Sequence, residues 1–138
     1  MIIEKELKMP AKAFYDKIID SVIFDIRTVT GEDIKRSRLK NYEYVKQFSK
    51  LNRAKILIQE VEENKIYQFK TSTTKNDFVV RYEIEDLGGD RCKVHYEETM
   101  KSFGFMQQMN DMVMGIVIGF FKKRNFKKMM TMIEKSYS

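Results

Sequence analysis

Three side chains capable of proton transfer lie on what the alternating pattern predicts to be one buried face of a sheet. Tyr82 belongs to one expected strand, and Tyr96 and Glu98 alternate along the next, so all three should project from the same side. A carboxyl group removed from water has a raised pKa, and beside tyrosine hydroxyls it could act as a general acid or base. One hypothesis is therefore an enzyme of the cyclase or isomerase type. The alternative is that Glu98 lies near its strand end, reaches solvent and anchors a loop, because glutamate is rarely buried.

Other kinds of catalytic site find little support, because the chain contains one histidine and one cysteine. His95 alternates with Val94 and Tyr96, so it should point to the solvated face, away from any nucleophile and acid. The phosphate-loop, CxxC and HExxH motifs are absent, and structural zinc usually takes four Cys or His ligands, so we expect no metal and no cofactor. Cys92 cannot form an internal disulfide, and no signal sequence or membrane span is evident. We therefore expect a cytoplasmic protein.

An uncharged apolar run, Met112–Phe121, contains two glycines one helical turn apart, Gly115 and Gly119. The run is much shorter than the roughly 20 residues needed to cross a bilayer, so it predicts a helix that is buried or lies on a surface. Each glycine weakens a helix interior by about 1 kcal/mol relative to alanine. The pair could keep a cavity open or let the helix bend. Alternatively, it could allow close packing against a large aromatic side chain.

A basic segment, KKRNFKK at 122–128, follows this run directly and supplies most of the net charge of +6. It could contact acidic lipid headgroups or nucleic-acid phosphates, or it could be the solvated side of a helix. We do not expect nucleic-acid binding, because the strands alternate basic with acidic residues, as in Arg81-Tyr82-Glu83, and offer no extended positive surface.

Part of the apolar run cannot be covered by a sheet alone. Four of its residues fall off the expected sheet-facing side of the helix, namely Met114, Val117, Ile118 and Phe121. A second subunit, an anionic membrane or a ligand with a loop lid could cover them. We expect a homodimer or another protein contact in preference to reversible docking on an anionic membrane, which the basic segment would favour.

Hydrophobic periodicity predicts the elements that would position these groups. A strand is expected at 2–9, a helix at about 11–29 and a short helical turn at 32–39. From 42 to 102 the period changes to two, and turn-like breaks divide this stretch into five strands in hairpin succession. From about 104 to 137, apolar residues recur at helical spacing without proline, which predicts one long helix.

This last helix should present a narrow apolar stripe to the sheet. At about 100° per residue, the members of the stripe in its second half are Phe126, Met130, Ile133 and Tyr137. Met112, Gly115 and Gly119 fall on the same stripe in the first half, so the two glycines should also face the sheet.

The order of these elements resembles the helix-grip fold of START lipid-transfer domains and polyketide cyclases, along a single domain at 1–138. More narrowly, FKTSTTKNDFVVRYEIE at 69–85 and GFMQQMNDMVMGIVIGFFKKRNFKKMM at 104–130 resemble an uncharacterised bacterial family known only as a domain of unknown function. The resemblance implies an α+β fold in which a curved antiparallel sheet of about six strands wraps around the long C-terminal helix. It also implies an apolar cavity between sheet and helix that accepts a lipid, a sterol or an aromatic ligand, although fold does not determine function.

The leading hypothesis is binding of a small apolar or amphipathic ligand in that cavity, without catalysis. Aromatic and aliphatic side chains should form its wall, and the expected members are Phe69, Phe78, Tyr82, Tyr96, Met109, Met112 and Ile116. Methionines suit an irregular ligand because they are adaptable, although they also fill ordinary cores. Gly115 and Gly119 would border the cavity, and Glu98 would serve as a polar handle. Further polar candidates on this face are Tyr44, Thr71 and Thr73.

Overall fold

The computed structural model describes residues 1–47, 53–102 and 126–137. Its elements are β1 (Ile2–Leu7), α1 (Ala11–Thr30), the short 3-10 helix η1 (Arg36–Arg38), β2 (Glu43–Gln47), β3 (Arg53–Glu62), β4 (Ile66–Ser72), β5 (Asn76–Gly88) and β6 (Arg91–Ser102). Residues 126–137 are also helical, and we call this segment the C-terminal helix.

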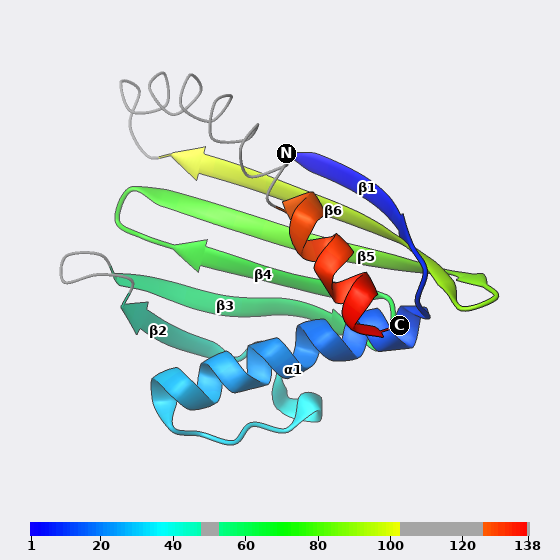
Figure 1. The fold of residues 1–138 in the computed structure, drawn as a ribbon. Coiled ribbons are helices and arrows are strands. Elements are labelled where there is room, and N and C mark those ends of the chain that lie inside the picture. The colour runs from blue at the N-terminus through cyan, green and yellow to red at the C-terminus, as the bar shows by residue number, and fades with distance from the viewer. Residues whose placement is uncertain (48–52, 103–125, 138) are drawn as a thin grey trace.

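The strands form one antiparallel sheet in the order β1-β6-β5-β4-β3-β2. The sheet is curved, and α1 and the C-terminal helix lie on the same side of it (Figure 1). Tyr82 of β5 shows this directly, because its ring contacts both Phe14 of α1, at 6.4 Å between centroids, and Phe126 of the C-terminal helix, at 6.1 Å. The expected α+β helix-grip architecture is confirmed.

Helix α1 begins and ends where its flanking residues predict. Pro10 precedes its first turn with a φ of −64°, an angle that the proline ring fixes and that suits a helix start. Gly31 follows its last turn in the left-handed conformation, with a φ of 79°, and its N–H donates to the Arg27 carbonyl at 2.9 Å. The predicted helix at about 11–29 is therefore confirmed.

The two faces of the strands also follow the sequence pattern. The buried residues of β5 are Val80, Tyr82 and Ile84, and those of β6 are Cys92, Val94 and Tyr96. His95 points to the opposite face, as predicted, where its Nδ1 lies 3.0 Å from Oε1 of Glu4 on β1. Period-two alternation thus correctly assigned the side of the sheet that carries the core.

The C-terminal helix packs onto the same core. Met130 is fully buried, and Phe126 and Ile133 pack against the buried cluster. Polar contacts also join this helix to β1 and the residue that follows it, since Lys5 Nζ donates to Thr131 Oγ1 and the Lys8 N–H donates to Glu134 Oε2 at 2.8 Å.

Two local predictions need correction. Tyr137, placed on the buried stripe, is 44% exposed, and Lys135 and Ser136 are exposed as well, which means that the core does not cover the last described turn of this helix. The helical turn expected at 32–39 is only the three residues of η1, whose Arg36 donates to Asp16 at 2.8 Å and to Asp20 at 2.9 Å on α1. These charge-assisted bonds hold the segment against α1 in place of a longer helix. The part of the predicted last helix at 104–125 lies outside the described residues.

Candidate functional site

A cavity of about 510 Å³ lies between the concave face of the sheet and the two helices. From α1 it is lined by Lys17, Ile18, Ser21, Val22 and Asp25; from the sheet by Tyr44, Lys46, Ile56, Tyr67, Phe69, Thr71 and Tyr82; and from the C-terminal helix by Met129 and Ile133. Helix α1, four strands of the sheet and the C-terminal helix therefore form the cavity together. Its volume lies within the range of small-molecule binding sites, about 300–1,000 Å³.

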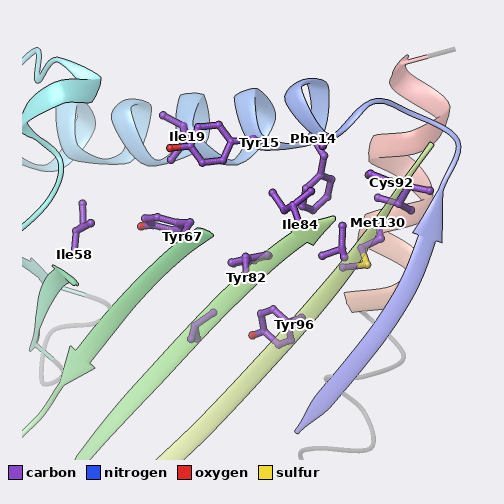
Figure 2. Packing of buried hydrophobic residues seen from close by; sticks show 14 of the residues in the cluster. Phe14, Tyr15, Ile19, Ile58, Tyr67, Tyr82, Ile84, Cys92, Tyr96 and Met130 are labelled. Atoms are coloured by element: carbon purple, nitrogen blue, oxygen red, sulfur yellow. The ribbon is translucent and has the colours of Figure 1, made fainter. Parts of the chain in front are cut away.

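Aromatic rings form a continuous belt along the floor of this cavity. Tyr67 of β4 lies directly opposite Tyr82 of β5, with ring centroids 6.2 Å apart and planes within 28° of each other. Phe69 packs beside Tyr67 at 5.5 Å, and Tyr96 of β6 packs edge-on to Tyr82 at 5.1 Å. Figure 2 shows Tyr67, Tyr82 and Tyr96 rising from three neighbouring strands on the side of α1. Phe126 then stacks on Tyr96 at 4.0 Å.

One end of the cavity is polar. Asp25 of α1 accepts a hydrogen bond from the Tyr44 hydroxyl at 2.7 Å and another from Lys46 Nζ at 2.7 Å, so each of its carboxylate oxygens has a donor. Burial, followed by the hydrogen bond to Asp25, raises the pKa of the Tyr44 hydroxyl. This trio joins α1 to β2.

The hydroxyls of Tyr67 and Tyr82 differ from that of Tyr44 because neither makes a hydrogen bond with any residue of the protein that the structure describes. Tyr67 is only 4% exposed and Tyr82 only 9%. Burial is the main reason that both hydroxyls have a pKa above the usual value of 10.0. Both groups therefore keep their protons at neutral pH and remain available as donors.

The pair expected to act as acid and base lies beside this cavity. The Tyr96 hydroxyl donates to Glu98 Oε2 at 2.8 Å, and burial together with the Glu98 charge raises the pKa of Tyr96. Neither residue is part of the cavity lining, and Glu98 is only half-buried. Glu98 lies inside β6, where it pairs with Val80, and its backbone N–H donates to the carbonyl of Met1, the residue before β1, at 2.8 Å.

The predicted site residues divide into three groups. Phe69 and Tyr82 line the cavity, and so do Tyr44 and Thr71 among the further candidates. Phe78 of β5 and Tyr96 and Glu98 of β6 do not line it, and Phe78 is half-buried opposite Thr71. The remaining five predicted residues lie outside the described part of the chain, namely Met109, Met112, Gly115, Ile116 and Gly119.

Sequence reasoning missed the contribution of α1. Ile18, Val22 and Asp25 recur at helical spacing and share one face of the helix, so a charged residue follows two apolar ones toward the cavity. That signal was available in the periodicity. What it could not supply was the pairing of Asp25 with Tyr44 and Lys46 on β2, which depends on how α1 lies across the sheet.

Within residues 1–47, 53–102 and 126–137, no cluster of three His, Cys, Asp or Glu side chains is arranged to hold a metal ion. Over the same residues, no helix combines the length and the apolar character that a membrane span requires.

Comparison with known proteins identifies the family. The family described as Domain of unknown function (DUF3284) matches residues 1–119. The chain belongs to this family. The sequence resemblance to an uncharacterised family is therefore confirmed, and that family carries no assigned activity. Among curated proteins the chain has no match.

Solved structures share the fold of this DUF3284 chain at low sequence identity. A conserved protein from Geobacillus kaustophilus is 12% identical, with a TM-score of 0.58 over 96% of this chain and 93% of that one. Norcoclaurine synthase from Thalictrum flavum, solved in complex with dopamine and hydroxybenzaldehyde, is 9% identical, with a TM-score of 0.56 over 99% of this chain and 84% of that one. The Mll3558 protein from Rhizobium loti is 13% identical, with a TM-score of 0.52 over 89% and 94% of the two chains. At such identities the likeness extends to the fold alone.

Proposed function

We propose that this protein binds a small apolar or amphipathic ligand in the cavity between the sheet, α1 and the C-terminal helix, and that it does so without catalysis. The observation that carries the proposal is the composition of the lining. Aliphatic and aromatic side chains cover most of the wall, and Asp25, Tyr44 and Lys46 form a hydrogen-bonded polar group within it. Such a division suits a ligand with an apolar body and a polar end.

A protein of the same fold has been solved with small molecules bound, which supports this proposal. Norcoclaurine synthase, which shares the architecture, was solved with two small aromatic molecules, so a helix-grip sheet can hold ligands of this size. For the present chain the argument depends on its own side chains. Both lipid-like ligands, such as those of START domains, and aromatic ligands can have an apolar body and a polar end.

A cavity-filling substitution tests the proposal. Val22→Trp places a large ring into the space from α1, and we expect it to abolish the fluorescence enhancement of 8-anilino-1-naphthalenesulfonate, a probe for apolar cavities. The matched control is Phe24→Trp, because Phe24 lies on the same helix but is 70% exposed. Circular dichroism would show that both variants fold. Equal probe binding by Val22→Trp and the wild type would refute the cavity as the binding site, and native mass spectrometry of the purified protein would reveal a retained ligand.

A cyclase- or isomerase-type enzyme remains a second proposal because Tyr96 and Glu98 are hydrogen-bonded. The pair would need to reach a substrate, yet the described part of the cavity ends before it. Glu98→Gln separates the two proposals. Unchanged ligand affinity with no turnover in either form would support binding alone, whereas turnover that disappears in the variant would support catalysis.

A homodimer and peripheral contact with an anionic membrane are further proposals about partners. The exposed Lys127 and Lys128 of the C-terminal helix favour an acidic partner surface. Sedimentation equilibrium and co-pelleting with anionic vesicles distinguish them, and a monomer that pellets only with such vesicles would reverse our preference for the dimer.

A further inference from the structure

Two tyrosine hydroxyls on the cavity floor have no hydrogen-bond partner among the described residues, and this limits what the cavity can hold. Tyr67 and Tyr82 line the cavity, are more than nine-tenths buried, and make no hydrogen bond with the described residues. The other polar side chain buried at this site, Tyr44, already donates to Asp25. Among the described residues, these two hydroxyls are therefore polar groups of the cavity floor that an occupant would meet without a competing protein partner.

Both tyrosines belong to the cavity lining, Tyr67 from β4 and Tyr82 from β5. Figure 2 shows both side chains on the side of the sheet that α1 covers, so their hydroxyls lie on the same side of the sheet as the cavity. The rings of Tyr67 and Tyr82 are 6.2 Å apart. A third ring inserted between them would need about 7 Å, since carbon atoms pack no closer than about 3.5 Å on each side. A ligand must therefore lie beside the two rings and not between them.

A purely apolar occupant would leave both hydroxyls without water and without a partner. Burying an unpaired polar group costs on the order of 1–3 kcal/mol in proteins. A hydrocarbon or an unbranched acyl chain incurs this cost at Tyr67 and Tyr82, whereas a ligand with an oxygen atom at this position does not. A flat ring system also packs against the neighbouring aromatic belt formed by Phe69 and Tyr82 more completely than a flexible chain does.

We propose that the cavity selects a flat aromatic ligand that carries a phenol or ketone oxygen on its inner edge, and that the hydroxyls of Tyr67 and Tyr82 bind this oxygen. The inference rests on the proposed function and names the ligand class for the same cavity. It assigns specificity to two residues and excludes plain hydrocarbons and acyl chains as preferred ligands.

The test compares two probes of similar size, 2-naphthol and 2-methylnaphthalene, of which only the first carries oxygen. We expect the wild type to bind 2-naphthol about tenfold more tightly, as one or two additional hydrogen bonds predict. The double variant Tyr67→Phe and Tyr82→Phe should bind the two probes with about equal affinity. Tyr15→Phe is the matched control, because Tyr15 is a buried residue of α1 that does not line the cavity. This variant should retain the preference for 2-naphthol.

Each other outcome has a distinct meaning. If the wild type binds both probes equally, or if the double variant keeps the preference, the inference is overturned while ligand binding stands. If neither probe binds the wild type and 8-anilino-1-naphthalenesulfonate also fails to bind, both the inference and the proposed function are wrong. Thermal unfolding of each variant verifies that the loss of preference reflects the cavity and not the fold.

Discussion

Arg81 and Tyr82 are neighbours on β5, and their polar groups differ in whether the described residues provide a hydrogen-bond partner. On the outer face, Arg81 donates to Glu60, Glu83 and Gln68, and His95 lies against Glu4. On the inner face, the hydroxyls of Tyr67 and Tyr82 find no partner among the described residues. Residues one position apart on the same strand thus have different surroundings, since successive side chains of a strand point to opposite faces.

This difference separates groups that the fold satisfies from groups that it leaves available. Water reaches the outer face, so each ion pair there competes with hydration and adds little net stability. The side chains of Tyr67 and Tyr82 are largely buried, and their hydroxyls have no hydrogen-bond partner among the described residues. An unpaired polar group in such a place usually indicates a function or a bound molecule. The comparison therefore points to the inner face as the binding surface.

The largest effect should follow from removing an apolar contact on the inner side. Met130 lies on the C-terminal helix and is fully buried, whereas Met132, two residues further along the same helix, is 70% exposed. We expect Met130→Ala to lower the free energy of unfolding by about 2–5 kcal/mol, and Met132→Ala to change it by less than about 0.5 kcal/mol. Urea denaturation measures both. Similar losses in the two variants would mean that the C-terminal helix does not pack onto the sheet as described.

The buried tyrosines should make the protein sensitive to alkali. Burial raises the pKa of Tyr67 and Tyr82 above the value of the unfolded chain, near 10.0, so ionisation favours the unfolded state as the pH rises beyond 10. Their contribution is fully present below pH 10 and decreases above it. Each should contribute about 1.4 kcal/mol per pH unit. We expect denaturation curves at pH 10–11 to have a shallower pH dependence in Tyr67→Phe, and an unchanged slope would contradict the burial of this hydroxyl.

The smallest effect should come from the outer face. Arg81→Ala removes two ion pairs, with Glu60 and Glu83, from a partly exposed position. Because solvent screens such pairs, we expect a loss of at most about 1 kcal/mol, and a smaller one in about 1 M salt. Urea denaturation at low and high salt measures this loss. A loss as large as that of Met130→Ala would mean that the outer pairs are integral to the fold, which would remove the contrast between the two faces.

Much of this arrangement could be predicted from residue patterns. The alternation of Val80, Tyr82 and Ile84 correctly predicted the buried face of β5, because a half-buried strand needs one apolar side. Pro10 and Gly31 correctly bounded α1, because each has a backbone preference that suits one helix end. The outward direction of His95 followed from the same alternation. These are local properties, and a local pattern is enough to predict them.

The site was predicted less completely. Tyr82 and Phe69 were named correctly as wall residues, whereas Asp25 and Lys46 were not considered, because they are 21 positions apart in the chain and meet only in the folded protein. Tyr96 and Glu98 were correctly placed on one face and are hydrogen-bonded, yet they lie beside the cavity and not in its wall. Sharing a face does not place two residues in one cavity when a helix crosses only part of the sheet.

Residue order alone was sufficient for the element types, the inner and outer sides of the strands and the family, since these depend on spacing and composition along the chain. Tertiary structure decided which inner residues meet. Helix α1 crosses the sheet so that Asp25 satisfies Tyr44, and the C-terminal helix stacks Phe126 on Tyr96. Tyr67 and Tyr82 are left facing open space between these two helices. That these hydroxyls have no partner among the described residues follows from how α1 and the C-terminal helix pack on the sheet, and such packing depends on the shapes of all the side chains at the contact rather than on a repeat in the sequence.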